Sequence, residues 1–433
     1  MESPISSGSS TLSTRSLLKA VLPSTSIPPS SIAGILDKVK TPFYYYDART
    51  VRSRYRGLRG ALPTGWKIFF AAKANPNVAI LEIYRKLGAM AECASAGEIE
   101  ACLKAGFASK KLALSGPVKT GAELRAIKKN PPYIVHAETP EELSELKELK
   151  TPLNVALRVN LDVGIKKDAD NVMIGGREKF GFSPEDIKKL LKNSGGLNVC
   201  GFHMYMGTQI LSSTVWLKGA ERFLDWVLKT CRKTGFNPSY INLGGGAGAP
   251  YGGNDGEFDL QKFKTGLARI EKKFSKEPEL SDAVFYIEPG RYLAAPTGVY
   301  VMKVVAIKKM RGVNFALTDG GIHHALFPFR VSRSFPARLI NRKGGKGLKK
   351  YILGGPLCTS LDQSDLPVTL PELRAGDVIG IYQSGSYGYT AGMHYFLSHP
   401  MPGEVLKDGT NLYLIRKPSA SKHIFDLQTK KSL

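Results

Sequence analysis

The sequence predicts a (β/α)8 barrel followed by a mostly antiparallel β-domain. Between residues 45 and 292, eight short apolar runs rich in β-branched and aromatic residues alternate with amphipathic helical patterns. After Pro289 the helical periodicity fades and short strand-like runs take over. Strands that alternate with helices are typical of a parallel barrel, whereas successive strands without helices indicate an antiparallel sheet.

The eight predicted barrel strands are Trp66 to Ala72, Met90 to Ala94, Lys111 to Ser115, Tyr133 to Ala137, Asn154 to Asn160, Val199 to Tyr205, Tyr240 to Leu243 and Val284 to Ile287. The helices predicted between them are Ala79 to Leu87, Ala96 to Ala105, Pro140 to Leu149, Pro184 to Lys192, Thr214 to Thr234 and Leu260 to Phe274. The later strands are Gly298 to Ile307, Phe315 to Thr318, Asp377 to Tyr382 and Thr410 to Ile415, and the early run Phe43 to Tyr46 is expected to join them. We therefore assign residues 45–292 to the barrel, and residues 36–44 with 293–418 to the β-domain.

Both ends of the chain are expected to be flexible. Residues 1–35 are rich in Ser, Thr and Pro and bury too little apolar surface to order themselves, so we predict a disordered tail. Residues 419–433 are expected to form a flexible C-terminal tail. A transit peptide has a similar composition, but Arg15 and Lys19 are the only bases before residue 32, which favours a cytoplasmic location.

Composition narrows the class of protein. No apolar run approaches the roughly 20 residues that a spanning helix needs, so we expect a soluble chain that binds no membrane. The five cysteines are dispersed without metal-ligand spacing, which fits a reducing compartment and no metal.

The net charge of +24 raises the possibility of nucleic acid, but the sequence has no zinc-finger or RNA-binding signature. A solvated basic surface and an acidic protein partner remain. The densest basic stretch, Arg338 to Lys350, is predicted to be a mobile loop.

Lys73 is the most informative single residue. It ends the apolar run Phe69-Phe70-Ala71-Ala72 at the mouth of the first predicted strand. An ammonium in such a poorly hydrated place is disfavoured, so we expect a neutral amine that forms imines. Because most lysines at strand ends simply reach solvent, this assignment depends on the neighbouring motifs.

Other residues that can support catalysis also follow predicted strands. Glu92 lies in the second strand, His203, Tyr205 and Thr208 end the sixth, and the glycines Gly244, Gly245 and Gly246 follow the seventh. Glycines can aim backbone N–H groups at a phosphate, although such a run is often only a flexible turn. In the turn Glu288-Pro289-Gly290-Arg291, the carboxylate can hold a ring nitrogen protonated and the arginine can pair with phosphate, or the two can form a simple salt bridge.

Seven motifs in order resemble those of the fold-type III pyridoxal phosphate decarboxylases, which include diaminopimelate and ornithine decarboxylases. They are AAKAN at Lys73, AECASAGE at Glu92, GFHMYMGTQ from Gly201, LGGGAG from Leu243, EPGR from Glu288, GPLC from Gly355 and SGSYGY from Ser384. The resemblance runs from about Thr41 to Leu406. It implies an alanine-racemase-like barrel with a β-domain, pyridoxal 5'-phosphate as cofactor, and a homodimer with active sites at the subunit interface.

The resemblance also implies a role for each matching residue. Lys73 would form the imine with the cofactor, Glu288 would bond to the pyridine nitrogen, and Cys358 of the partner subunit would return a proton after CO2 leaves. The other residues implied to bind the cofactor are Glu92, His203, Tyr205, Thr208, Gly244, Gly245, Gly246, Gly290, Arg291 and Tyr387. Those expected to contact substrate are Arg291, Thr359, Asp362 and Tyr387.

Two departures from the family pattern bear on the substrate. Tyr205 stands where diaminopimelate decarboxylases have the second histidine of HxHxGSQ, so the face that stacks on the cofactor has no titratable nitrogen. Thr359 follows Cys358, where relatives that handle diamines carry Glu or Asp. Because a hydroxyl cannot neutralise a desolvated ammonium, the distal end of the substrate is expected to be neutral, acylated or anionic.

The pattern CTSLD, together with QSGSYG and FLSHPMPGEVL, resembles a secondary-metabolism subgroup that acts on carrier-protein-bound glutamyl groups or acylated diamino acids. Acyl carrier proteins are acidic, which would give the basic charge a use. Three alternatives remain: a decarboxylase of free diaminopimelate, lysine or ornithine; an amino-acid racemase; and an inactive regulator that keeps the fold. Retention of Lys73, Glu288, Arg291 and Cys358 favours an enzyme.

Overall fold

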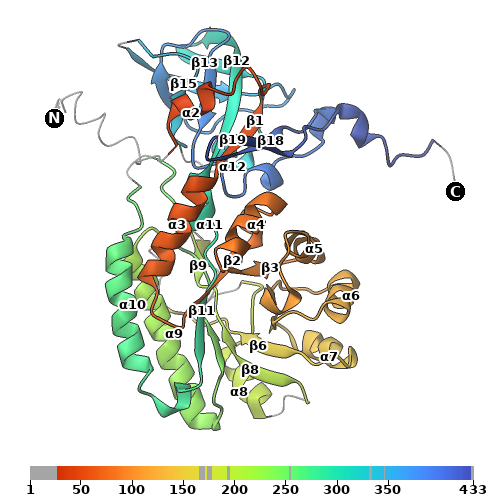
Figure 1. Cartoon of the computed structure of the whole chain (residues 1–433), viewed down its shortest axis with the longest axis vertical. Coiled ribbons are helices and arrows are strands. Elements are labelled where there is room, and N and C mark those ends of the chain that lie inside the picture. Colours follow the sequence, from red (N-terminus) through yellow and green to blue (C-terminus); the bar gives the residue numbers. More distant parts are fainter. Residues whose placement is uncertain are drawn as a thin grey trace, which may run out of the picture.

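The computed structural model describes residues 27–164, 171–172, 178–192, 196–252, 255–330, 334–345 and 347–430. A closed barrel of parallel strands lies below a β-sheet domain in Figure 1. Both predicted parts of the fold are therefore confirmed. Among the described residues, no helix has both the length and the apolar character needed to cross a lipid bilayer.

The barrel contains the eight strands that the sequence predicts. They are β2 (Lys67–Ala71), β3 (Met90–Cys93), β4 (Leu112–Leu114), β5 (Ile134–Ala137), β6 (Asn154–Arg158), β8 (Asn198–His203), β10 (Tyr240–Asn242) and β11 (Val284–Ile287). Each pairs in parallel with the next, and β11 pairs with β2 to close the ring. Because all eight run the same way, the side chains at their C-terminal ends meet at one mouth.

Helices follow the strands around the outside of the barrel. They are α4 (Val78–Lys86), α5 (Ala96–Lys104), α6 (Gly121–Lys129), α7 (Pro140–Glu148), α8 (Pro184–Lys192), α9 (Ser213–Thr234), α10 (Leu260–Phe274) and the short α11 (Arg291–Ala294). The sequence analysis missed α6 and also α3 (Ala48–Ala61), which precedes the barrel. Both begin with recognisable caps: Thr120 and Glu123 form a capping box at α6, and Asp47 accepts the N–H of Thr50 at α3.

The β-domain is built on one nine-stranded sheet. Its strands are β1 (Phe43–Asp47), β12 (Gly298–Met310), β13 (Val313–Thr318), β14 (Ala337–Leu339), β15 (Leu348–Gly354), β16 (Val368–Pro371), β17 (Val378–Ile381), β18 (Gly403–Asp408) and β19 (Asn411–Arg416). As predicted, the early strand β1 joins this sheet, where it lies between β12 and β18. It extends to Asp47, three residues past the predicted domain boundary at residue 44.

The predicted N-terminal tail ends earlier than expected. Residues 1–26 lie outside the described part of the chain, but residues 27–35 are ordered and include the helix α2 (Pro29–Ala33). Ile27, Ile32 and Ile35 are buried against the β-domain sheet. Three isoleucines spaced along this segment provide the apolar surface that the Ser, Thr and Pro residues lack. The flexible C-terminal tail from residue 419 stays a prediction.

The basic stretch from Arg338 to Lys350 is not one loop. Its two ends belong to β14 and β15, and several of its cations are paired. Arg342 makes a bidentate ion pair with Asp377, at 2.7 Å and 2.8 Å, and Lys349 pairs with Glu372. Lys346 lies outside the described residues. The prediction of a mobile loop is therefore wrong for the strand residues at both ends.

Candidate active site

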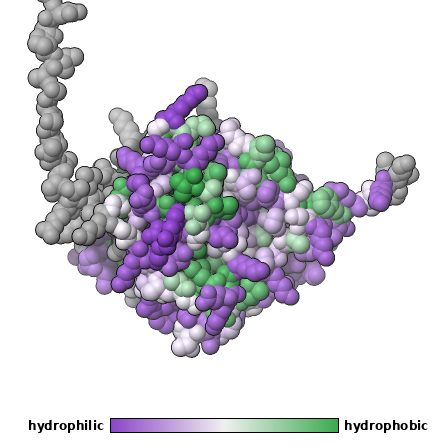
Figure 2. Space-filling model, turned by 90° about the horizontal axis from the view of Figure 1, so that it is seen from above, coloured by the Kyte–Doolittle hydropathy of each residue, from purple (hydrophilic) through white to green (hydrophobic). Residues whose placement is uncertain are grey.

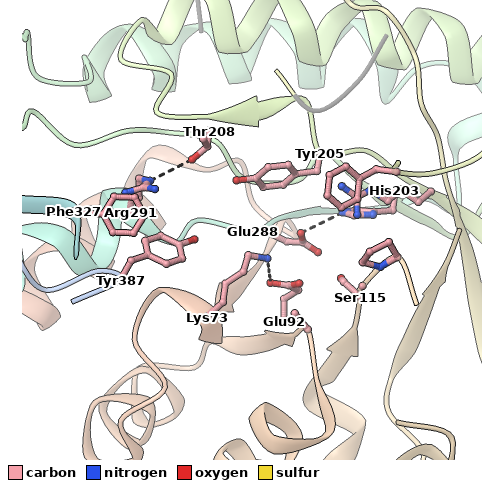
Figure 3. Close-up of a pocket in the computed structure, with 15 residues that line it drawn as sticks. Lys73, Glu92, Ser115, His203, Tyr205, Thr208, Glu288, Arg291, Phe327 and Tyr387 are labelled. Carbon is pink, nitrogen blue, oxygen red and sulfur yellow. Dashed lines mark hydrogen bonds and ion pairs between the residues drawn. The ribbon is translucent and has the colours of Figure 1, made fainter. Parts of the chain in front are cut away.

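A pocket of about 330 Å³ lies at the C-terminal mouth of the barrel (Figure 3). Its lining residues are Lys73, Glu92, Ala94, Ser115, Gly116, Pro117, Arg158, Phe180, His203, Tyr205, Thr208, Glu288, Arg291, Phe327 and Tyr387. Eight of the predicted site residues are among them: Lys73, Glu92, His203, Tyr205, Thr208, Glu288, Arg291 and Tyr387. Seven of them lie in or after barrel strands that are far apart in the sequence, and Tyr387 comes from the β-domain.

Lys73 lies in the 3-10 turn Ala72–Ala74 directly after β2. Its Nζ donates to Glu92 Oε2 at 2.7 Å, and Glu92 is fully buried on the neighbouring strand β3. Burial alone would lower the pKa of Lys73, but the attraction of Glu92, together with Tyr387, Tyr205 and Glu288, outweighs burial and raises this pKa. The expectation of a neutral amine is therefore wrong. The carboxylate of Glu92 favours the ammonium form of Lys73.

Two tyrosines stand on either side of this lysine. The ring centroid of Tyr205 lies 5.7 Å from Lys73 Nζ, and Figure 3 shows the hydroxyls of Tyr205 and Tyr387 pointing into the pocket. Tyr387 has a φ of +49°, a conformation that aromatic residues rarely adopt, and its N–H donates to Ala74 O at 2.8 Å. This bond fixes the β-domain to the Lys73 turn. Burial raises the pKa of Tyr387, so its hydroxyl stays a neutral donor.

Glu288 forms the floor of the pocket, and both of its carboxylate oxygens are held. Asn242 Nδ2 donates to Oε1 at 2.8 Å, and His203 Nε2 lies 3.2 Å from Oε2. Burial, and then the nearby Arg158, lower the pKa of His203. The imidazole is therefore neutral, and the carboxylate requires its proton to be on Nε2. His203 Nδ1 is then a buried acceptor with no partner among the described residues.

His136, which the sequence analysis did not identify, stacks on His203. The two ring centroids are 3.9 Å apart and the planes differ by 10°. Ser115 Oγ lies 2.9 Å from His136 Nδ1, and Tyr240 Oη lies 2.8 Å from Nε2. Burial lowers the pKa of His136 as well, so both stacked rings are neutral and Glu288 carries the only charge of this group. The atoms of His136, His203 and Glu288 that could bind a metal ion lie within 4.8 Å of one another. All three side chains already make hydrogen bonds.

The glycine turn after β10 is too crowded for side chains. A Cβ on Gly245 would lie 2.2 Å from Glu288 O, and Gly244 and Gly246 have φ values of +68° and +97°. The N–H of Gly244 donates to Asn242 Oδ1, whereas the N–H groups of Gly245 and Gly246 have no acceptor among the described residues. The glycines pack beside the pocket wall rather than lining it. Such a turn suits an anion that approaches the backbone.

Arg291 lies at the same end of the pocket. Its Nε donates to Thr208 Oγ1 at 3.2 Å and its Nη1 donates to Tyr251 Oη at 2.8 Å. Its guanidinium carbon lies 4.5 Å from the ring centroid of Tyr387 and 5.2 Å from that of Phe327. Within the described part of the chain, Arg291 has no carboxylate partner. A half-buried guanidinium held only by neutral groups is available to an anion.

Gly290, the residue before Arg291, packs against the segment that carries Lys73. A Cβ there would lie 3.1 Å from the Cβ of Ala74 and 3.4 Å from that of Ala71, so this turn packs directly on the segment that carries Lys73. A side chain at this position would push the two segments apart. The structure therefore places Gly290 as a support for the cofactor site rather than as a lining residue.

The GPLC loop does not reach the pocket of its own chain. Cys358 is exposed, Thr359 is partly exposed, and neither lines the pocket. A bridge between Gly354 and Gln363 closes the base of the loop and makes it a compact projection. The roles predicted for Cys358 and Thr359 would therefore need a second copy of the chain.

Asp362 has a different role from the predicted substrate contact. It is only 4% exposed, and its carboxylate accepts the N–H groups of Ile322 at 2.7 Å and Leu357 at 2.8 Å. Burial raises the pKa of Asp362. The side chain ties the GPLC loop to the segment after β13, so its oxygens are not free to bind a ligand.

The sequence analysis also missed Ser115, Arg158, Phe180 and Phe327. Ser115 ends a predicted strand and Arg158 lies two residues before the end of another, so the reasoning that identified Glu92 from its predicted strand also applies to them. Phe180 lies in a connecting segment and Phe327 in the short helix α12 (Leu326–Arg330), and neither has a local signal in the sequence. Only the folded arrangement shows that these two aromatic rings close the pocket.

The pocket fits the pyridoxal phosphate that the motifs imply. Lys73 supplies an amine, Glu288 a buried carboxylate for a ring nitrogen, and Arg291 with the glycine turn a place for a phosphate. Glu92 Oε1 and His203 Nδ1 are buried and lack partners among the described residues, as expected where polar groups face a ligand.

Comparisons with known proteins agree with this geometry. The family model "Pyridoxal-dependent decarboxylase, pyridoxal binding domain" matches residues 48–295. The chain is 31% identical over 421 residues to "L-glutamyl-[BtrI acyl-carrier protein] decarboxylase" of Niallia circulans, covering 93% of this chain and 98% of that relative. It is 27% identical over 398 residues to diaminopimelate decarboxylase of Helicobacter pylori strain J99, covering 90% and 96%. The crystal structure of diaminopimelate decarboxylase from Helicobacter pylori complexed with L-lysine has a TM-score of 0.81 and 25% identity, and covers 92% of this chain and 98% of that one. The chain therefore belongs to the pyridoxal-dependent decarboxylases and is a pyridoxal-phosphate-dependent carboxy-lyase.

Proposed function

We propose that this decarboxylase acts on an amino-acid unit whose far end carries no free ammonium, and that an acidic carrier protein presents it. The proposal depends on one observation, which is that both carboxylates lining the pocket already have partners within the chain. Glu92 pairs with Lys73, and Glu288 is held by His203 and Asn242. Among the described residues, no other carboxylate lines the pocket. A free distal ammonium would thus be buried without a counter-ion, which is costly.

The GPLC loop supports the same substrate class. Thr359 follows the cysteine where a carboxylate would be needed, and the nearest acid in the loop, Asp362, is bonded to backbone N–H groups. A loop contributed by a second subunit would therefore bring no free negative charge to the distal end. A neutral, acylated end, such as the carbonyl that joins a tether, avoids the cost of an unpaired charge.

The surface charge and the relatives support the carrier protein. The net charge is +24, and Lys308, Lys309 and Arg311 of the β12–β13 hairpin have no ion-pair partner in the described part of the chain. Figure 2 shows hydrophilic side chains around apolar ones on the face seen from above. The relative from Niallia circulans bears the name of a decarboxylase of a carrier-bound glutamyl group. An acidic carrier would be steered toward such a basic surface.

The roles of the pocket residues follow from their contacts. Glu92 pairs with Lys73 and favours its ammonium form, so Lys73 would lose a proton before its amine bonds to the cofactor's aldehyde. Glu288 would keep the ring nitrogen of the cofactor protonated, and the neutral His203 orients that carboxylate. Pyridoxal phosphate, when bound, supplies an electron sink for the electron pair left behind by departing CO2. Tyr205 would contact the cofactor ring, and Arg291 and Thr208 would hold the phosphate.

We further propose a homodimer in which Cys358 of the partner subunit returns the proton to Cα. Cys358 is exposed at the tip of the GPLC loop, where it can reach another chain. Leu361 and Leu366 beside it are 42% and 40% exposed, which is expected for residues that an interface covers. This arrangement would complete the pocket with a proton donor that one chain does not supply. The family assignment and the intact Lys73 site support decarboxylation over the racemase and inactive-regulator alternatives.

The test compares tethered and free substrates. The purified chain, loaded with pyridoxal phosphate, is mixed with an acyl carrier protein that bears a γ-glutamyl thioester, and intact-protein mass spectrometry follows the loss of CO2. Free glutamate, lysine, ornithine and diaminopimelate are the comparison substrates. We expect turnover of the tethered group and little of the free diamines, and the variant Thr359→Glu should gain activity toward the diamines. Rapid turnover of a free diamine by the unaltered enzyme would refute the proposal.

A further inference from the structure

Arg158 is a buried guanidinium with most of its donors unused. It is the last residue of β6, its side chain is 7% exposed, and it lines the pocket. Nη1 donates to Glu138 Oε1 at 2.8 Å, which is the only acceptor for this guanidinium among the described residues, and Nε is buried without a partner. Buried donors normally find an acceptor, so a ligand oxygen is the expected partner.

The side chain of Arg158 is held in place before any ligand binds. Glu138 is itself fixed, because its second oxygen, Oε2, accepts the N–H of Gly181 at 3.1 Å. The ring of Phe180 covers the guanidinium, with its centroid 4.5 Å from the central carbon. A donor held on two sides loses little conformational freedom when it binds an oxygen.

The position of Arg158 indicates which oxygen it meets. Arg158 and His203 are register partners on the adjacent strands β6 and β8. Figure 3 shows His203 on the side of the pocket opposite Arg291 and Thr208. Arg158 therefore belongs to the wall that faces away from the phosphate end.

We propose that the guanidinium of Arg158 donates to the phenol oxygen of pyridoxal phosphate and keeps that oxygen ionised. The inference rests on the cofactor placement proposed above, with Lys73 at the aldehyde, Glu288 at the ring nitrogen and Arg291 at the phosphate. In the cofactor, the phenol oxygen and the phosphate arm flank the aldehyde carbon on opposite sides. With the phosphate beside Arg291, the phenol oxygen faces the wall of Arg158. A cation beside a phenol favours its charged form.

Glu138 tunes this effect, because it neutralises part of the charge on Arg158. Removing Glu138 alone should strengthen the stabilisation of the phenolate. Removing both members of the ion pair should abolish it without leaving an uncompensated buried charge. The variants Glu138→Gln and Glu138→Gln/Arg158→Met therefore differ only in the guanidinium.

The experiment measures the absorbance of the bound cofactor against pH, in the absence of substrate. We expect the ionisation midpoint of the phenol to be lowest in Glu138→Gln, intermediate in the unaltered protein and highest in the double variant. The double variant should lie at least about one pH unit above Glu138→Gln and bind the cofactor about tenfold more weakly. Arg291→Met is the matched control. It should weaken cofactor binding through the phosphate but leave the phenol midpoint unchanged.

Equal midpoints in Glu138→Gln and the double variant would overturn the inference. So would an unchanged cofactor spectrum with only a raised KM for substrate, because Arg158 would then contact the substrate instead. If the double variant does not fold, the variant Arg158→Lys replaces it, because this variant keeps a cation beside Glu138 but has no guanidinium. Its ionisation midpoint for the phenol is expected to lie above that of the unaltered protein. Because this measurement uses no substrate, a negative result for Arg158 does not depend on whether the proposed substrate is correct.

Discussion

Lys73 and Glu92 show how one neighbour reverses the effect of burial on a lysine. Desolvation disfavours the ammonium, but a buried carboxylate at 2.7 Å favours it by more, and the pKa of Lys73 rises. The position of the lysine was predictable from the strand that precedes it. The sign of its pKa shift was not, because it depends on the pairing of β2 with β3, which no local pattern in the sequence encodes.

The variant Glu92→Gln should speed attachment of pyridoxal phosphate at neutral pH. Removal of the carboxylate lowers the pKa of Lys73, and each unit by which it falls raises the fraction of neutral amine about tenfold. Stopped-flow absorbance across a pH series measures the rate. Glu100→Gln, an exposed acid on the following helix, should retain the profile of the unaltered protein. An unchanged profile in Glu92→Gln would show that Glu92 does not control the lysine.

At the scale of elements, the turn after β10 depends on having no side chains. The variant Gly245→Ala would place a Cβ 2.2 Å from Glu288 O, so the turn or the floor of the pocket must shift. We expect a loss of about 1–3 kcal/mol in the free energy of unfolding, as in other overpacked sites, and weaker cofactor binding. Thermal unfolding with and without pyridoxal phosphate tests both effects. Gly256→Ala, where a Cβ would meet nothing within 4 Å, is the control and should be neutral.

His324 connects three segments of the β-domain and makes stability depend on pH. Its Nε2 donates to Pro400 O at 2.7 Å and its Nδ1 accepts from Tyr300 Oη at 2.9 Å. Burial lowers the pKa of His324 to about 4, whereas an unfolded histidine titrates near 6.5. Between these values the unfolded chain binds a proton that the folded chain does not. The free energy of unfolding therefore falls as the pH falls, by up to about 3 kcal/mol.

The variant His324→Gln should lack this pH dependence. It should be less stable than the unaltered protein at pH 7, because its hydrogen bonds are disrupted, and the difference should narrow as the pH approaches 4.5. Urea unfolding at a series of pH values measures the difference. His423→Gln, at an exposed position, should show no such narrowing. A constant difference would mean that His324 has the same pKa in the folded and the unfolded chain.

The elements were predictable where the sequence pattern is regular and long. All eight barrel strands and the helices α9 and α10 follow from alternating apolar runs and helical periodicity. The strands β14, β15, β16 and β18 were missed because strands in a mixed sheet are defined by their partners more than by their own composition. The site was predicted best at strand ends. Phe180 and Tyr251 come from connecting segments and Phe327 from the short helix α12, and only the fold brings these residues together.

At the scale of the whole molecule, the account requires two chains for one complete site. Lys73 lies in the pocket of its own chain, whereas Cys358 lies outside it. The single variants Lys73→Ala and Cys358→Ala should each be inactive. When equal amounts are mixed and exchange subunits, mixed dimers with one intact site should restore about a quarter of the original activity. No recovery after proven subunit exchange would place both residues in the same site of one chain.

The covalent attachment of the cofactor tests the central claim most directly. The chain is loaded with pyridoxal phosphate, reduced with borohydride, digested and mapped by mass spectrometry. We expect a pyridoxyl group on Lys73 and on no other lysine. A label on a different lysine, or no label after loading at saturating cofactor, would contradict it.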